Sequence, residues 1–113
     1  MKPDVSKTLS ALGLCKKAGK LVLGFDAAAD AIKKGNVRLL LLARDISPKS
    51  AGKITRPALD KNIKTLTLPV AMDELWHMLG KRAGILAVTD EGLAALIIKT
   101  SKAVCQYEEE NSL

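Results

Sequence analysis

Apolar residues recur along this chain at two different spacings, and the change from one spacing to the other outlines its elements. Between Asp4 and Lys17 the apolar side chains lie three or four positions apart, as on one face of a helix; they are Val5, Leu9, Leu12 and Cys15. The continuous apolar run Leu39–Ala43 is instead typical of a strand that is buried on both faces. Helical and strand-like segments alternate in this way along the whole chain.

The pattern predicts five helices and four strands. The predicted helices are Asp4–Lys17, Phe25–Lys34, Pro48 to about Lys61, Met72–Leu79, and a last one from Thr89 to about Lys102. The predicted strands are Leu21–Leu23, Leu39–Ala43, Ile63–Leu66 and Ile85–Val88, of which the first is expected to be short and buried.

Glycine, proline and capping residues mark the boundaries of these elements. Ser47 followed by Pro48 is typical of an N-cap and the first helical position. Gly35 and Gly80 are expected to end their helices, and Thr89 is expected to cap the last one. Pro57 lies inside the third helix, so that helix is expected to be bent, split or continuous, and the sequence leaves these alternatives open.

Helices that alternate with four short apolar strands predict an α/β fold, a three-layer α/β/α sandwich whose sheet is at least partly parallel. The length of 113 residues fits one domain, residues 1–113, with residues 104–113 as a partly frayed acidic tail. Cys15 and Cys105 form no CxxC pair and indicate free thiols in a reducing, cytoplasmic compartment. No signal peptide is visible, and no apolar run is long enough to span a membrane, so no membrane partner is expected.

The charge is distributed unevenly and points to a polyanionic partner. Residues 1–70 hold 14 basic and five acidic side chains, whereas residues 71–113 hold four and seven. Only three aromatic residues are present, Phe25, Trp76 and Tyr107, so the chain lacks the stacking platform that binders of single strands use. A folded RNA, recognised by its shape and phosphates, suits this composition better than an unstructured strand.

Candidate catalytic chemistry is sparse. His77 is a lone histidine beside Trp76, and Cys15 lies on the apolar face of the first helix, so both are interpreted as structural residues. Asp26 and Asp30 share a helix face, but surface ion pairs with nearby lysines explain them. Walker, dinucleotide and metal-ligand patterns are lacking. We therefore expect no enzyme activity, no catalytic residue, no metal and no cofactor.

Several segments resemble, in their order and spacing, the L-seven-Ae ribosomal protein family. They are Ala18–Gly24, Ala31–Gly35 and Leu39–Asp45, and the later segments Leu79–Arg82 and Ile85–Ala94 look most like its bacterial YlxQ branch. The resemblance covers about residues 6–100. It implies a four-stranded mixed sheet and non-enzymatic binding of structured RNA, commonly a kink-turn, in the ribosome or another ribonucleoprotein of the translation apparatus.

The resemblance also implies where the RNA-binding residues lie. The glycine before the second helix and the polar residues that open this helix read sheared G·A pairs in the family, and they correspond here to Gly24, Asp26, Ala27 and Asp30. Phe25, which lies between them, is expected to belong to the same RNA-binding site. The loop that covers bulged nucleotides corresponds to Lys81, Arg82, Ala83 and Gly84. Lys20 and Lys34 stand where the family tends to be basic.

At the start of the second helix the sequence departs from the kink-turn binders, which carry an Asn-Glu pair and a lysine there. Asp26 can accept a hydrogen bond from a guanine amino group, Ala27 has no polar side chain, and Asp30 brings an anion towards phosphates. A protein-interaction module that keeps the fold but has lost kink-turn recognition is therefore the alternative. The expected partners are structured RNA and ribosomal proteins, and the chain is expected to be a monomer.

Overall fold

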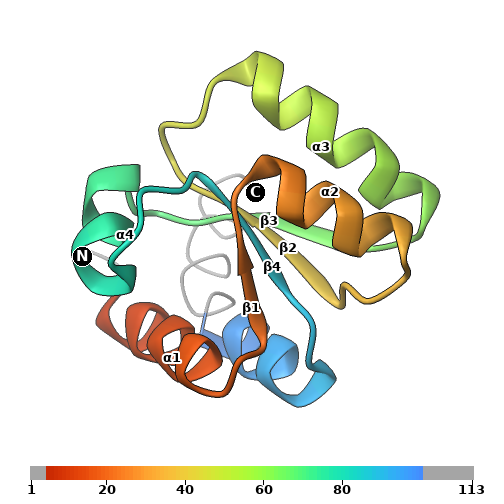
Figure 1. The fold of residues 1–113 in the computed structure, drawn as a ribbon. Helices are drawn as coiled ribbons and strands as arrows, with labels where there is room; N and C mark the ends of the chain where they lie inside the picture. The colour runs from red at the N-terminus through yellow and green to blue at the C-terminus, as the bar shows by residue number, and fades with distance from the viewer. Residues whose placement is uncertain (1–4, 101–113) are drawn as a thin grey trace, which may run out of the picture.

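The computed structural model describes residues 5–100, and these residues form a twisted sheet with helices on both of its faces (Figure 1). The helices are α1 (Val5–Lys17), α2 (Phe25–Lys33), α3 (Pro48–Asp60), α4 (Met72–Leu79) and a last helix that includes residues 91–100. The strands are β1 (Leu21–Leu23), β2 (Leu39–Leu42), β3 (Lys64–Thr67) and β4 (Ile85–Val88). The predicted α/β/α sandwich is confirmed.

The sheet is mixed and has the strand order β1-β4-β2-β3. β4 runs antiparallel to both of its neighbours, with Leu23 opposite Leu86 on one side and Leu41 opposite Leu86 on the other. β2 and β3 are parallel, as expected for strands joined through a helix, with Leu39 opposite Lys64. The carboxyl ends of β1, β2 and β3 and the amino end of β4 therefore meet at one end of the sheet.

Two hydrophobic cores lie on the two faces of the sheet. Alternate residues of β2 supply them, because successive side chains of a strand point to opposite faces. Leu39 and Leu41 belong to the core under α1, α4 and the last helix, and Leu40 and Leu42 belong to the core under α2 and α3. The prediction that β2 is a central strand buried on both faces is confirmed.

Three details differ from the sequence-based expectations. β1 is an edge strand and only half-buried, because one of its sides lacks a neighbouring strand. β3 begins one residue later than predicted, at Lys64. The last helix is capped by Asp90, whose carboxylate accepts a 2.9 Å hydrogen bond from the Leu93 N–H, whereas the Thr89 hydroxyl donates to the carbonyl oxygen of Lys20.

α2 and β2 each end one residue earlier than predicted, at Lys33 and Leu42, and the boundary predictions that follow are confirmed or lie outside the described residues. The Ser47 side chain accepts a 3.2 Å hydrogen bond from the Ser50 N–H at the start of α3. α3 continues through Pro57 without splitting. Gly35 and Gly80 follow α2 and α4 with φ angles of 76° and 72°. The end of the last helix near Lys102, the acidic tail and Cys105 lie outside residues 5–100.

Candidate functional site

A shallow depression of about 390 Å³ lies at the sheet end where the carboxyl ends of β1 and β2 meet the amino end of β4. We call it the sheet-end depression. Its lining combines a loop that the sequence singled out with segments that it did not, and consists of Gly24, Phe25, Asp45, Ile46, Ser47, Ser50, Met72, Arg82, Ala83, Gly84 and Ile85.

Backbone hydrogen bonds across the sheet hold the two predicted site segments together. The Gly24 N–H donates to the carbonyl oxygen of Ile85 at 2.9 Å, so the start of α2 is joined to the start of β4. The Ala43 N–H donates to the carbonyl oxygen of Gly84 at 2.8 Å, which joins the end of β2 to the same loop. The structure thus brings Gly24 and Phe25 together with the segment from Arg82 to Gly84.

Three helices begin at the rim of the sheet-end depression, because Phe25, Ser47 and Met72 all line it. In α3 the Ser47 side chain caps the Ser50 N–H, and in α4 the Asp45 carboxylate accepts a 2.9 Å hydrogen bond from the Met72 N–H. The start of α2 has no side-chain cap. Its first N–H groups and the positive end of its dipole are therefore available to an anion.

Two glycines are required by the backbone of this site. Gly24 adopts φ 100° and ψ 160°, a region that only glycine enters without strain. Gly84 lies against Met72, and an added Cβ would come within 2.8 Å of the methionine sulfur. Side chains larger than hydrogen would thus disturb the depression at both positions.

Charged side chains surround the depression in loosely held pairs. Arg82 Nε lies 3.9 Å from Asp73 Oδ1, and an Arg44 guanidinium nitrogen lies 3.9 Å from Glu74 Oε1. All four side chains are about half exposed or more, and such surface pairs contribute only ~0–1 kcal/mol. Both arginines can therefore exchange their carboxylate partners for a ligand anion at little cost.

Lys16 positions the loop that follows α4. Its ammonium group donates a hydrogen bond to the carbonyl oxygen of Leu79, the last residue of α4. This contact places a cation at the negative end of the helix dipole and fixes the point where the segment from Gly80 to Gly84 begins. Lys81 is exposed in that segment beside the depression without lining it.

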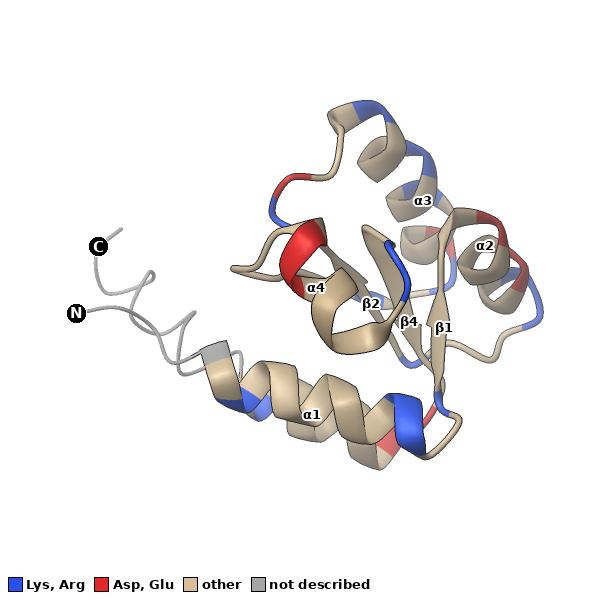
Figure 2. Ribbon diagram, turned by 60° about the vertical axis from the view of Figure 1, so that its left-hand side comes forward, with Lys and Arg blue, Asp and Glu red and all other residues tan. Residues whose placement is uncertain are grey.

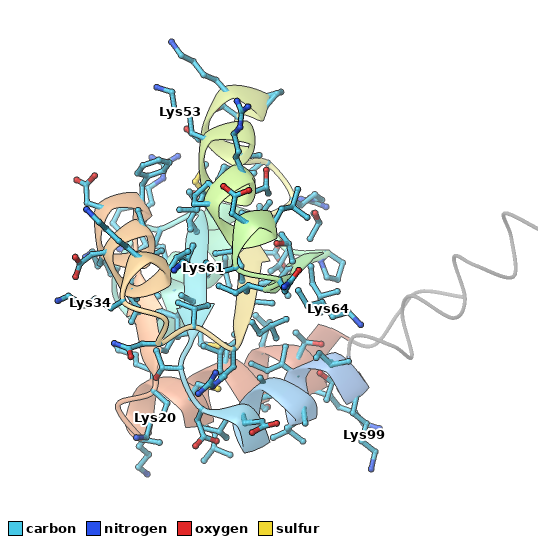
Figure 3. All side chains as sticks on the ribbon, turned by 90° about the vertical axis from the view of Figure 1, so that its right-hand side faces the viewer. Lys20, Lys34, Lys53, Lys61, Lys64 and Lys99 are labelled. Atoms are coloured by element: carbon cyan, nitrogen blue, oxygen red, sulfur yellow. The ribbon has the colours of Figure 1, made fainter. Side chains whose placement is uncertain are left out.

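Three predicted site residues lie away from the sheet-end depression, namely Lys20, Asp30 and Lys34. Lys20 precedes β1, and its carbonyl oxygen accepts a 3.0 Å hydrogen bond from the Thr89 N–H at the opposite end of the sheet. Lys34 lies just beyond the far end of α2 (Figure 3). Its ammonium group forms a 3.0 Å ion pair with Asp30. Asp26 is exposed in the first turn of α2, next to the rim. The structure therefore divides the predicted set between two ends of the molecule.

The depression also contains residues that the sequence did not single out. Asp45, Ile46, Ser47 and Ser50 follow β2, and Met72 opens α4. Only Ser47 carried a sequence signal. As an N-cap it indicated that a helix begins there, but not that this helix start lies in the depression. Their shared position follows from the parallel pairing of β2 with β3, which sends the chain from both strands to the same end of the sheet.

The other candidate residues are structural or exposed. Cys15 is fully buried in the core, and burial raises the pKa of its thiol, with a further contribution from the negative charge of Asp90. His77 is exposed on α4. Within residues 5–100 no three His, Cys, Asp or Glu side chains cluster as metal ligands would, and no helix there combines the length and apolar character of a membrane span.

Comparison with known proteins gives three related findings. Residues 6–98 match the family described as "Ribosomal protein L7Ae/L30e/S12e/Gadd45 family". The RNA-binding protein YlxQ of Bacillus subtilis (strain 168) is 34% identical over 92 residues, which are 77% of this chain and 87% of that protein. A solved structure described as a protein with unknown function from Bacillus halodurans C superposes with a TM-score of 0.78, at 24% identity, over 83% of this chain and 95% of that one.

Proposed function

Because this chain belongs to the ribosomal protein L7Ae/L30e/S12e/Gadd45 family, we propose that it binds structured RNA at the sheet-end depression and catalyses no reaction. The observation that carries the proposal is the junction of the uncapped start of α2 with the basic loop before β4. The relative from Bacillus subtilis, described as an RNA-binding protein, supports the same function.

The phosphate groups of the RNA interact with the start of α2 and with the arginines. The free N–H groups after Gly24 bind a phosphate oxygen through the backbone, which requires no particular side chain. Arg82 contributes a planar, always charged guanidinium group that binds phosphate through two N–H groups at once. Most of the affinity comes from such contacts, so it falls as salt is raised.

An unpaired nucleotide of the RNA occupies the depression itself. The volume of about 390 Å³ accommodates one base and part of its sugar, and Phe25 offers an apolar surface against which a base can pack. Ser47 and Ser50 supply hydroxyl groups to base edges or to the 2′-hydroxyl. Double-helical RNA alone does not expose a base in this way, so the target combines paired arms with unpaired nucleotides.

A kink-turn is the RNA element that fits these requirements best. Asp26 is exposed at the rim and can accept a hydrogen bond from the amino group of a guanine in a sheared G·A pair. Ala27 adds no polar contact, so the backbone at Gly24 carries a larger share of the recognition. In this proposal the protein binds such an RNA as a monomer, within a cytoplasmic ribonucleoprotein of the translation apparatus that also contains ribosomal RNA and ribosomal proteins.

A fluorescence-anisotropy titration with a labelled kink-turn RNA tests the proposal. The control RNA replaces the sheared G·A pairs with Watson–Crick pairs, and both are measured at two salt concentrations. Arg82→Gln is compared with Lys99→Gln, which removes the same charge from an exposed position on the last helix. We expect preference for the kink-turn, a steep salt dependence, and loss of affinity only with Arg82→Gln.

Two results would contradict the proposal in different ways. Equal affinity for both RNAs would support RNA binding but contradict specific recognition of the kink-turn. Absence of binding to either RNA, together with wild-type folding, would favour the protein-interaction module, for which the exposed acids of α2, Asp26 and Asp30, would be the contact surface.

A further inference from the structure

The outward face of α3 carries a row of three cations. Lys49, Lys53 and Arg56 are spaced by four and three residues, so they share one helix face and are all exposed. The opposite face is the one that buries Ile54 and Ala58 against the sheet. Among the ion pairs within residues 5–100, none involves these three side chains.

The charge at the start of α3 is the reverse of that at the other two helices on the rim. α2 has Asp26 in its first turn, and α4 has Asp73 and Glu74, as the positive end of a helix dipole favours. α3 has no acid in its first turn and carries Lys49 there instead. The helix dipole does not favour a cation at this position, so helix stability does not explain Lys49.

Beyond the free N–H groups at its start, α2 exposes acidic side chains that would repel phosphates. α2 and α3 cover the same face of the sheet, and the first two turns of α2 expose Asp26 and Asp30, whereas the corresponding part of α3 is basic (Figure 2). An RNA that occupies the sheet-end depression thus meets acids on two helices at the rim and cations on the third. The favourable path for its backbone leads over α3.

We propose that Lys49, Lys53 and Arg56 form a phosphate-binding ridge, which receives a double-helical arm of the RNA bound at the sheet-end depression. The ridge begins two residues after Ser47, which lines the depression, and extends about 10 Å along the axis of α3. α3 contains no aromatic side chain for base stacking, so its contacts are to the backbone of a paired arm and are independent of sequence.

The inference rests on the proposed function, and one set of titrations separates the two. The variant combines Lys49→Gln, Lys53→Gln and Arg56→Gln. Its charge-matched control combines Lys7→Gln, Lys64→Gln and Lys99→Gln, which are exposed and belong to α1, β3 and the last helix. Each protein is titrated against a kink-turn RNA with two long arms and against versions in which one or the other arm is shortened.

We expect the ridge variant to bind the long-armed RNA more weakly than the control variant does. Each phosphate contact that is lost should flatten the log–log salt dependence by roughly 0.7–0.9, so the slope should change by about 2 for two or three contacts. Shortening one particular arm should reduce wild-type affinity and abolish the difference between wild type and the ridge variant. All three residues are exposed, so thermal unfolding should be nearly unchanged.

Other outcomes would overturn the ridge. If the ridge variant shows the wild-type salt slope on the long-armed RNA, the ridge proposal is wrong, whereas the proposed RNA site at the depression is unaffected. A loss that persists whichever arm is shortened would show that the ridge contacts the RNA core and not an arm. If the wild-type protein binds none of these RNAs, both the ridge proposal and the proposed function are wrong.

Discussion

The backbone of Gly84 lies so close to the side chain of Met72 that a Cβ atom at position 84 would approach the methionine sulfur to 2.8 Å. The contact joins the loop before β4 to the first residue of α4, within the lining of the sheet-end depression. Gly84 is also held from the other side, since its carbonyl oxygen accepts the hydrogen bond from Ala43. A side chain at position 84 must therefore displace Met72.

Gly84→Ala is expected to lower the free energy of unfolding by about 1 kcal/mol, because the crowded methionine is flexible and can partly withdraw. In a Met72→Ala background the same substitution should be nearly neutral. Urea denaturation of the four proteins of this double-mutant cycle measures the coupling. Additive effects of the two substitutions would contradict the close contact.

Gly24→Ala should be destabilising for a different reason. The φ of 100° and ψ of 160° at Gly24 cost a residue with a side chain on the order of 1–3 kcal/mol. Gly52→Ala is the matched control, since Gly52 is helical in α3 and an added Cβ meets nothing within 4 Å. The control should gain about 0.5–1 kcal/mol, and equal effects of the two substitutions in thermal unfolding would refute the argument.

Ser47 allows the structural and the binding role of one position to be separated. Ser47→Ala removes the cap of α3 and should cost about 1 kcal/mol. Ser47→Asp keeps a capping oxygen and should restore stability, yet it places a negative charge in the lining of the depression. RNA titrations should then show weaker binding for Ser47→Asp despite its wild-type melting temperature. Wild-type RNA affinity of Ser47→Asp would show that no phosphate of the bound RNA lies near the start of α3.

The thiol of Cys15 should be inert in the folded protein. Burial raises its pKa, so at neutral pH less of the reactive thiolate is present than in the unfolded chain. In a Cys105→Ser background, alkylation by iodoacetamide at pH 8 should be slow in buffer and fast in denaturant. Rapid alkylation of the folded protein would contradict the buried position.

The same pKa shift makes a pH-dependent contribution to stability. Below the ordinary thiol pKa, Cys15 is protonated in both the folded and the unfolded state, and the free energy of unfolding is unaffected. Above it the unfolded state releases the proton first, so stability falls as pH rises towards the folded-state pKa. Cys15→Ala should remove this component from the alkaline part of the stability curve.

The sequence predicted most of the fold because its local signals agree with one another. The spacing of apolar residues identified α1 and α2, and Ser47 and Gly80 marked where helices begin and end. The half-buried state of β1 was not predictable in the same way. Leu21–Leu23 is as apolar as a central strand, and its position at the edge depends on which strand pairs with β4.

The candidate site was predicted only in part, since it depends on how the strands are arranged. Lys20 and Gly24 are close in sequence, but β1 lies between them and separates them to opposite ends of the sheet. Gly24 and Gly84 are far apart in sequence, and the antiparallel pairing of β1 with β4 brings them together. Periodicity and turn signals carry no information on which strands pair, so Asp45 and Met72, whose positions follow from the pairing of β2 with β3, could not be placed in the site.

The pairing of Leu21 with Val88 determines when β1 can fold during synthesis of the chain. The strand β1 is made early in synthesis, but it has no partner until β4 has left the ribosome. Such long sequence separation slows folding, because a large loop must close before the contact forms. A nascent chain that ends before Arg82 has the start of α2 but not the segment from Arg82 to Gly84 that completes the depression. Shorter chains should therefore be unable to engage RNA at this site.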